Sequence, residues 1–309
     1  MQTEYRVIKC PICDGHKTFF KSVYRHKHDY FSNKKIYGCN NCGLYFVNPK
    51  IEDSKLNKYN SSYHENAHQG HKRNKKLEAF FSGISKLRIE IIKNNSLFKE
   101  NSNLKVLEVG PGPGAFAKEW LKYFPNSKYY AIESDKILHN QLKKNGINII
   151  DNVDNKWNVF FDLIVISHVL EHVNDPLEFL NNYTKTLKKG GLIFLEVPCS
   201  DFMHKAIDEP HLLFFEKIPI KKMIKNLKLD LIKLGYYGTP IRKINSLRSK
   251  FFKKIRSFLW VKNITYYHPQ KDKLNKILNN EIETEALLNF DAHIEQDEPS
   301  WWLRVIAKK

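Results

Sequence analysis

A hydrophobic strand that runs directly into a glycine-rich turn constrains the fold of this chain more than any other feature. Residues 104–109 are apolar except for a lysine and a glutamate, and glycines follow at positions 110, 112 and 114. Glycine lets the backbone turn tightly and approach a nucleotide-like ligand closely. With the helical segment at 115–123, this pattern predicts the first unit of a parallel α/β sheet.

The segment from 104 to 237 repeats this alternation of short β-branched runs and helical stretches, which is typical of a parallel sheet with crossover helices. We expect seven strands in one Rossmann-like α/β sheet. They are predicted at residues 105–109, 129–133, 147–150, 163–167, 192–197, 229–236 and 302–307. Asp175, Pro176 and Glu178 form a helix start, and the helix is predicted to end at the lysines and glycines of residues 188–191.

Four of the five cysteines form two Cys-x-x-Cys pairs, separated by 25 residues. They are Cys10, Cys13, Cys39 and Cys42. Two such turns can present four thiolates to one tetrahedral ion, so the sequence predicts a small Zn²⁺ ribbon at residues 1–50. Iron is the main competitor, because it also accepts four thiolates. A site closed by four protein ligands is structural rather than catalytic.

The glycine pattern alone also fits a dinucleotide-binding enzyme, so the acidic residues around it matter. Glu108 stands two residues before Gly110, where a carboxylate suits an ammonium group and is poorly placed beside a pyrophosphate. Glu133 ends the next strand, 23 residues beyond Gly110, where it can accept ribose hydroxyls. The fourth strand then leads into the sequence Ser-His-Val-Leu-Glu-His-Val-Asn-Asp-Pro of residues 167–176.

Together these motifs resemble the class I S-adenosylmethionine-dependent methyltransferases. The glycine turn with its acids, residues 161–176 and the Gly190-Gly191 turn before the fifth strand carry the resemblance. The cysteine pairs and the Pro-His-Leu-Leu-Phe-Phe run of residues 210–215 are similar to a zinc-containing subgroup that methylates sugars in deoxysugar and surface-polysaccharide pathways. The resemblance covers residues 5–237 and the last strand, and it implies S-adenosylmethionine as cofactor.

The resemblance also implies roles for individual residues. Glu108 would hold the methionine ammonium and Glu133 the ribose hydroxyls, while the glycines pass beneath the cofactor. Asp151 or Asn152 would lie near the adenine, where an ordinary loop acid is the alternative for Asp151. The implied cofactor-binding set is Glu108, Gly110, Gly112, Gly114, Glu133, Ser134, Asp151, Asn152, Ser167 and His168.

A hydroxyl acceptor needs a general base, and histidine has the most suitable pKa near neutral pH. Three histidines follow the fourth and fifth strands, where acceptor-facing residues of an open α/β sheet lie. His172 and His211 are favoured over His168, and a capping or structural role is the alternative for each.

The chain is expected to divide into the ribbon (1–50), a helical lid or linker (51–103) and the cofactor-binding domain (104–309). Tyr59 and Tyr63 are candidates for lid contacts. Sugar C-methyltransferases of the zinc subgroup have a second α/β domain, whereas only about 70 residues follow the core here. We therefore expect O- or N-methylation of a sugar, sugar nucleotide or polysaccharide precursor.

A basic helical insertion is predicted within residues 238–298. Between positions 217 and 276 there are 17 Lys or Arg residues and two acids, within a chain of net charge +18. An apolar stripe in residues 241–262 lies opposite the basic residues. Such a helix can receive a phosphate-bearing acceptor or contact an anionic membrane, and a lid packed on the core is the alternative.

The sequence leaves other functions open. An RNA methyltransferase would use the basic block, but no Asn-Pro-Pro-Tyr-like motif follows the fourth strand, so nucleic acid is not the favoured partner. A non-catalytic interaction protein and a dehydrogenase are further alternatives. The chain has no secretory signal and no apolar run long enough to span a membrane, so a cytoplasmic location is expected.

Overall fold

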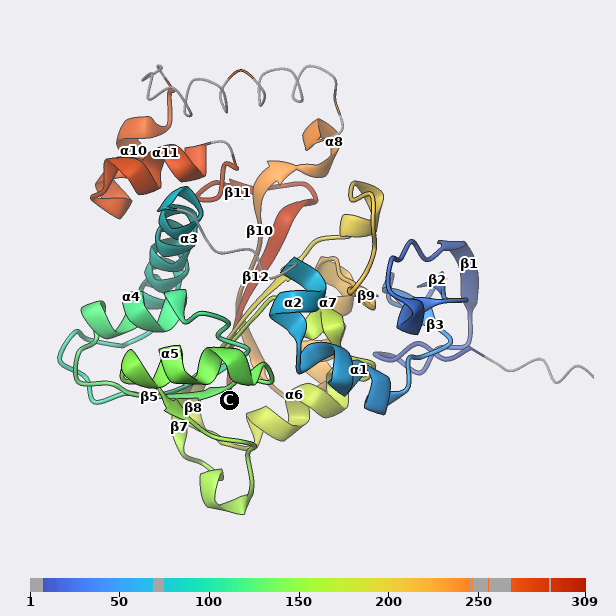
Figure 1. The fold of residues 1–309 in the computed structure, drawn as a ribbon, viewed down its shortest axis with the longest axis horizontal. Helices are drawn as coiled ribbons and strands as arrows, with labels where there is room; N and C mark the ends of the chain where they lie inside the picture. The colour runs from blue at the N-terminus through green and yellow to red at the C-terminus, as the bar shows by residue number, and fades with distance from the viewer. Residues whose placement is uncertain (1–7, 69–74, 245, 247–254, 256–267, 289) are drawn as a thin grey trace, which may run out of the picture.

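The computed structural model describes residues 8–309 apart from 69–74, 245, 247–254, 256–267 and 289. Within these residues a mixed sheet of eight strands forms the centre of the molecule, in the order β11-β10-β12-β8-β7-β4-β5-β6 (Figure 1). Its strands are β4 (Lys105–Val109), β5 (Lys128–Ile132), β6 (Asn148–Ile149), β7 (Phe161–Ser167), β8 (Leu187–Pro198), β10 (Asp230–Pro240), β11 (Glu295–Gln296) and β12 (Ser300–Lys308).

The register explains where ligands can approach the sheet. Strands β6, β5, β4, β7 and β8 are parallel, whereas β12 and β10 are antiparallel to their neighbours. The chain crosses from β5 and β6 on one side of β4 to β7 on the other. The carboxyl ends of β4 and β7 therefore flank a topological switch point, where open α/β sheets bind ligands.

Helices cover both faces of this sheet. One face packs on α3 (Lys75–Asn94), α4 (Ala115–Tyr123) and α5 (His139–Lys144) through a core that includes Ile92, Trp120 and Leu142. The other packs on α6 (Pro176–Thr184) and α7 (Lys217–Asn226) through a core that includes Leu180 and Met223. Because β4 alternates between the faces, Val106 and Leu107 enter different cores.

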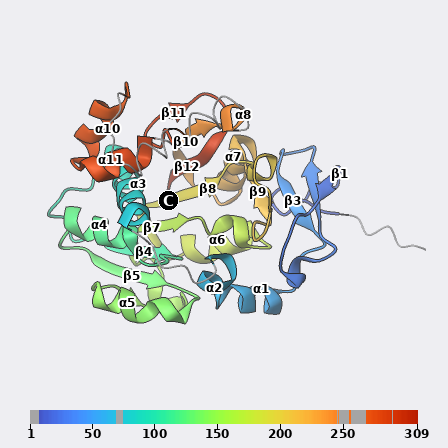
Figure 2. The same ribbon diagram turned by 45° about the horizontal axis from the view of Figure 1, so that its top comes forward.

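The cysteine-bearing segment forms a second, four-stranded sheet with the order β1-β2-β3-β9. Strands β1 (Thr18–Val23), β2 (Lys35–Cys39) and β3 (Tyr45–Asn48) come from the N-terminal segment. Strand β9 (Leu213–Phe214) comes from the loop after β8 and lies beside β3 (Figure 2). The N-terminal module is therefore joined to the main domain by backbone pairing as well as by side-chain packing.

The helices between the two modules, α1 (Asp53–Asn60) and α2 (Tyr63–His68), lead into α3. Toward the C-terminus, α10 (Lys271–Leu278) and α11 (Glu281–Leu288) pack on α3 around Ile84, Leu87 and Leu287 (Figure 1). Among the described helices, none has the length and apolar character needed to cross a membrane.

Two sequence predictions need correction. The helix that starts at Pro176 ends at Thr184, and residues 187–191 already belong to β8. Thr184 and Thr186 donate their hydroxyls to the carbonyls of Asn181 and Tyr183, which competes with continued helix. The sheet also has an eighth strand, β11, which pairs with β10 through only two residues.

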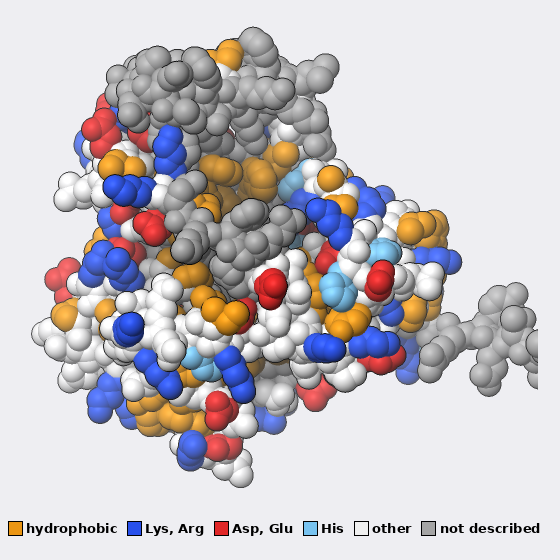
Figure 3. Space-filling model, in the orientation of Figure 1, with side chains coloured by type: hydrophobic (Ala, Val, Ile, Leu, Met, Phe, Trp, Pro, Cys, Tyr) orange, Lys and Arg blue, Asp and Glu red, His pale blue; other side chains and the backbone are white. Residues whose placement is uncertain are grey.

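The predicted basic helix at 241–262 lies mostly outside the described residues. Only its start, α8 (Ile241–Ile244), is a described helix, and Arg242 pairs there with Glu298 at 2.5 Å. In the space-filling view of Figure 3, hydrophobic side chains lie in a hollow in the upper half of the face of the molecule that is turned toward the viewer.

Candidate active site

The glycine loop forms a tight turn between β4 and α4, with open space on one side. Gly110, Gly112 and Gly114 all have positive φ, between +54° and +81°. A Cβ at Gly110 would come within 2.5 Å of Val169 Cγ2, so the close approach of the two loops requires glycine. A Cβ at Gly112 would meet no atom within 4 Å, so the space beside it is open to a ligand.

Glu133, one residue after β5, is bound to the same loop. Its Oε2 accepts a hydrogen bond from the Gly112 amide at 2.9 Å, and its Oε1 accepts one from the Asp135 amide at 2.9 Å. Burial raises the pKa of the Glu133 carboxyl. Glu133 and the glycine turn, which were both expected to contact the cofactor, therefore lie next to each other.

Glu108 lies below this loop, on the face of β4 that α3 covers. It is almost fully buried, and its Oε2 accepts a hydrogen bond from the Tyr129 hydroxyl at 2.8 Å. Burial raises the pKa of Glu108 to about 7, against the opposing effects of Tyr129 and Arg88. This carboxyl is therefore poised between its neutral and charged forms near physiological pH.

The other predicted cofactor contacts lie along the same edge of the sheet, after three different strands. Ser134 is exposed, and its hydroxyl donates to the Asn60 carbonyl at 3.2 Å. Asp151 and Asn152 are exposed beyond β6. Ser167 ends β7, and its buried hydroxyl oxygen makes no hydrogen bond within the described residues.

His168 follows β7 with a left-handed backbone, φ +56°, which non-glycine residues rarely adopt. Its Nε2 lies 3.1 Å from Glu196 Oε1, and its Nδ1 lies 3.3 Å from Glu171 Oε1. Burial acts to lower the pKa of His168, but the two carboxylates outweigh it and raise the pKa to about 9. A histidine held in the charged form is poorly suited to be a base at neutral pH.

Glu196 is the centre of a buried ionic network. It pairs with Arg88 from α3 and with Arg304 from β12, whose Nε lies 2.5 Å from Glu196 Oε2. Glu196 and Arg304 are fully buried. The carboxylate that pairs with His168 is therefore itself held by arginines from two other elements of the fold.

His172 and His211, the other candidate bases, lie together on the far side of Glu171. Their ring centroids are 4.8 Å apart. His211 Nδ1 lies 2.7 Å from Asp201 Oδ2, and Lys205 Nζ lies 2.6 Å from the same carboxylate oxygen. Because a carboxylate only accepts, His211 donates from Nδ1 and its Nε2 is left to accept a proton.

The environment of His172 differs from that of His211. Its Nδ1 lies 3.4 Å from the Pro210 carbonyl, and burial lowers its pKa to about 3. The geometry therefore brings both predicted histidines to one place but makes His211, with Asp201 behind it, the better general base.

Tyr63 of α2 lies between the cofactor-binding edge and this cluster. Its ring stands edge-on to His172, with centroids 5.5 Å apart. Burial raises the pKa of the Tyr63 phenol, and the charges of Glu171 and Glu133 add to the effect. The lid contact of Tyr63 with substrate or cofactor stays a prediction.

The loop that carries His211 is held by the N-terminal module. Asp208 accepts hydrogen bonds from Arg25 through the backbone amide, Nε and Nη2, at 2.7, 3.0 and 2.5 Å. Glu209 accepts from the amides of Lys27 and His28 and from the Tyr59 hydroxyl. The ribbon thus fixes the backbone on which the candidate base lies.

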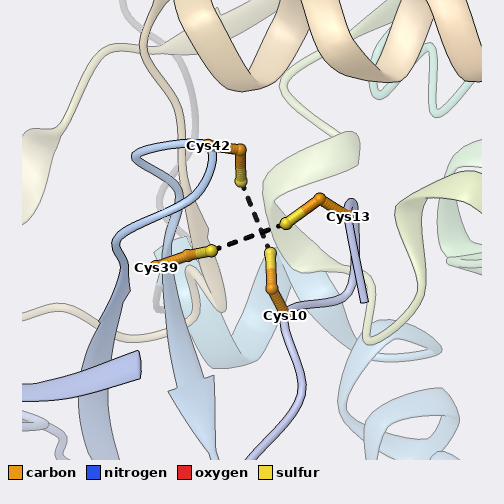
Figure 4. A group of neighbouring side chains, drawn as sticks. All are labelled: Cys10, Cys13, Cys39 and Cys42. Carbon is orange, nitrogen blue, oxygen red and sulfur yellow. Dashed lines mark hydrogen bonds between the residues drawn. The ribbon is translucent and has the colours of Figure 1, made fainter. Parts of the chain in front are cut away.

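The side chains of the four cysteines point toward one another within this module (Figure 4). Cys10 Sγ lies 3.5 Å from Cys42 Sγ, and Cys13 Sγ lies 3.5 Å from Cys39 Sγ. All four sulfur atoms lie within 4.8 Å of one another. In a tetrahedral site with Zn–S bonds of 2.3 Å, neighbouring sulfurs are about 3.8 Å apart, so the arrangement fits such an ion.

No role was predicted from the sequence for Glu171, Asp201, Glu196, Arg88 or Arg304. Glu171 was visible within the motif after the fourth strand, since it lies between His168 and His172. Asp201 precedes His211 by ten residues, and the two arginines come from α3 and β12, so the sequence held no local signal for these contacts.

Comparison with known families agrees with this geometry. Residues 71–255, more than half of the chain, match the model of a family described as a methyltransferase domain. This chain belongs to that methyltransferase family. The matched residues of the methyltransferase include the glycine loop, Glu133 and all three candidate histidines. Among curated proteins, none matches the sequence significantly.

Solved methyltransferase structures are similar to this methyltransferase at low sequence identity. One from Thermotoga maritima, described as a possible histamine N-methyltransferase, is 15% identical with a TM-score of 0.47, over 75% of this chain and 91% of that one. A S-adenosylmethionine-dependent methyltransferase from Archaeoglobus fulgidus is 16% identical with a TM-score of 0.47, over 74% of this chain and 94% of that one.

Proposed function

We propose that this protein uses S-adenosylmethionine to methylate an oxygen or nitrogen of a sugar, sugar nucleotide or surface-polysaccharide precursor in the cytoplasm. The observation that carries the proposal is the placement of two parts at one edge of the sheet. The glycine loop with Glu133 follows β4 and β5, and the Asp201–His211 pair follows β8.

The residues of the first part fit the cofactor. Gly112 leaves open space beside the backbone, and Glu133 lies on the loop, where it can accept ribose hydroxyls. Glu108 would hold the methionine ammonium, and this positive charge would favour its ionised form. When bound, the cofactor supplies an electrophilic methyl group on a sulfonium.

The second part would bind and activate the acceptor. The protein mainly has to orient the acceptor in line with the methyl group. His211 Nε2 is the group best placed to take the acceptor proton, because Nδ1 donates to Asp201 and the carboxylate stabilises the imidazolium that forms. Tyr63, beside His172, would close the space between cofactor and acceptor.

The four cysteines would hold a structural Zn²⁺. Arg25, Lys27 and His28 of the module donate hydrogen bonds to Asp208 and Glu209 in the loop that carries His211, so the ion would support the acceptor side of the site rather than the cofactor side. The sugar acceptor rests on the resemblance of the cysteine pairs and of residues 210–215 to zinc-containing sugar methyltransferases. The basic residues around 217–243 would favour a phosphate-bearing acceptor.

Methyl transfer from labelled S-adenosylmethionine tests the proposal directly. Panels of sugar nucleotides, lipid-linked sugars and RNA are offered to the zinc-loaded full chain. We expect label in a sugar-containing acceptor, and loss of transfer in His211→Asn but not in Glu178→Gln, an exposed acid of α6. Label in RNA alone would replace the sugar acceptor, and no transfer to any panel would favour a non-catalytic role.

A further inference from the structure

Three side chains that can bind a metal ion converge beside the candidate base. His172 Nε2 lies 3.8 Å from Glu171 Oε1, and His211 Nε2 lies 4.0 Å from the same oxygen. One ligand atom from each of the three residues lies within 4.8 Å of the other two. The group is distinct from the four cysteines and lies on elements of the methyltransferase domain.

The outer hydrogen bonds of the two histidines set which nitrogen faces inward. His211 Nδ1 donates to Asp201 Oδ2, and His172 Nδ1 faces the Pro210 carbonyl, which can only accept. In the neutral tautomers both Nε2 atoms are therefore acceptors, and both face Glu171. Histidine ligands of metal ions commonly donate their second N–H to a carboxylate or a backbone carbonyl in this way.

Glu171 supplies the independent observation. It is fully buried, and neither of its carboxylate oxygens accepts a hydrogen bond within the described residues. The nearest cationic group is His168 Nδ1, 3.3 Å from Oε1, and Oε2 has no such contact. Oε1 is thus paired with the protonated His168, whereas Oε2 has no hydrogen-bond partner within the described residues, so a cation between this carboxylate and the two inward-facing nitrogens would stabilise its buried charge.

We propose that Glu171, His172 and His211 bind one divalent transition-metal ion. Ligand atoms of a tetrahedral site with bonds near 2.1 Å are about 3.4 Å apart, so the two distances from Glu171 Oε1 to the histidine nitrogens need to shrink by about half an ångström. Two imidazoles and one carboxylate suit Zn²⁺, Fe²⁺ or Mn²⁺, and three protein ligands leave a position for a further ligand. Both imidazole side chains are buried, with 8% of their surface exposed, so the ion would be largely shielded from solvent.

The inference rests on the proposed function, because the free position would receive the acceptor. An ion there lowers the pKa of a bound hydroxyl. The hydroxyl proton leaves to water, the acceptor oxygen forms a bond to the methyl carbon, and the carbon–sulfur bond breaks with its electrons on sulfur. In this state His211 Nε2 is a ligand and cannot also take the acceptor proton, so the ion would promote loss of that proton to water by lowering the pKa of the hydroxyl.

Titration of the zinc-loaded full chain with Co²⁺ tests the site without any turnover. We expect about one further equivalent to bind, with the visible absorption of a nitrogen and oxygen site and without a thiolate-to-cobalt band. Glu171→Gln and His172→Asn should lose this equivalent, and Asp201→Asn should weaken it by about 10- to 100-fold. His16→Asn, at an exposed histidine of the ribbon, should bind as the wild type does.

Binding of S-adenosylhomocysteine by each variant shows that it is folded. The inference is overturned if the wild type takes up no second ion from Co²⁺, Zn²⁺ or Mn²⁺, or if Glu171→Gln takes up as much. Methyl transfer that persists after chelation of the second ion would also overturn it and would keep the proposed function. Uptake of the ion without transfer to any acceptor would keep the site and remove that function.

Discussion

Arg25 of the N-terminal module and Asp208 of the loop after β8 are 183 positions apart in the chain and form a three-fold hydrogen-bonded pair. Asp208 is buried, whereas the Arg25 side chain is 42% exposed. His211, the candidate base, follows Asp208 by three residues. The pair therefore couples the position of the base to the folding of the ribbon.

Arg25→Ala should weaken catalysis without weakening cofactor binding. The loop would lose its side-chain contacts, and a small displacement of His211 is expected to lower kcat by about tenfold or more. Steady-state kinetics with S-adenosylmethionine and calorimetry with S-adenosylhomocysteine measure the two effects. Lys27→Ala is the matched control, because Lys27 contributes its backbone amide rather than its side chain to Glu209. An equal loss of cofactor affinity in Arg25→Ala would show that the effect is not confined to the acceptor loop.

Removal of the Zn²⁺ proposed for the four cysteines should also weaken catalysis without weakening cofactor binding. Strand β9 continues the sheet of the ribbon, and the Val47 amide donates to the Leu212 carbonyl, next to His211. Stripping Zn²⁺ with a chelator should therefore abolish methyl transfer while S-adenosylhomocysteine still binds, and re-addition should restore transfer. Cys39→Ser should also abolish methyl transfer, and added Zn²⁺ should not restore it. Full activity in the metal-free protein would refute a positioning role for the ribbon.

Asp201→Asn should lower kcat by about 10²- to 10⁴-fold. The amide can donate to Nδ1, which favours the other tautomer of His211 and removes the acceptor at Nε2. The histidine and the adjacent cation Lys205 also hold the pKa of Asp201 well below its usual range, so the carboxylate is charged at all working pH values. A pH–rate profile compares the variant with the wild type. Unchanged kcat would exclude the pair from proton transfer.

Cofactor affinity should rise with pH through about 7, where Glu108 ionises. Burial raises the pKa of this group in the free protein, so its neutral form is favoured below that pH and an ammonium gains a partner only above it. The same shift makes Glu108 stabilise the folded protein less as pH rises from the unfolded pKa toward 7. Calorimetry between about pH 6 and pH 8 should show the rise for wild type, and Glu108→Gln should bind weakly at every pH. A flat wild-type profile would remove Glu108 from ammonium recognition.

Glu196→Gln should destabilise the fold. It leaves the buried Arg88 and Arg304 without their shared counter-charge, and breaking such a pair costs about 3–5 kcal/mol. Chemical denaturation measures the change in the free energy of unfolding. Glu90→Gln on α3, at an acid whose side chain is 42% exposed, should change it little. A similar, small change in both variants would show that the network does not stabilise the protein.

The sequence predicted what depends on local patterns. The glycine turn, the seven strands and the helix start at Asp175 follow from residues close together in the chain, and the structure confirms them with shifts of a few residues at most strand ends. The helix end at Thr184 was not predicted. The sequence signal for a helix end lies at the lysines and glycines of residues 188–191, but the hydroxyls of Thr184 and Thr186 bind backbone carbonyls where the helix ends earlier. The edge strand β11 was not predicted, because it has only two residues and shows no periodic pattern in the sequence.

The candidate site was predictable only in part, because its contacts join distant segments. His168, His172 and His211 were identified from their places after strands, but the partners that distinguish them come from elsewhere. Asp201 sets the tautomer of His211 and makes it the better candidate base, whereas Glu196 helps to keep His168 charged. The pairing of β9 with β3 depends on two residues of each strand and had no sequence signature.

Calorimetric titration of the zinc-loaded protein with S-adenosylmethionine, S-adenosylhomocysteine and NAD shows whether the glycine loop and Glu133 bind the proposed cofactor, and Glu133→Ala is the matched variant. We expect the first two ligands to bind with a Kd on the order of micromolar, NAD not to bind, and both affinities to be lost in Glu133→Ala. Absence of binding by either methionine-derived ligand, or unchanged affinity in Glu133→Ala, would contradict this expectation.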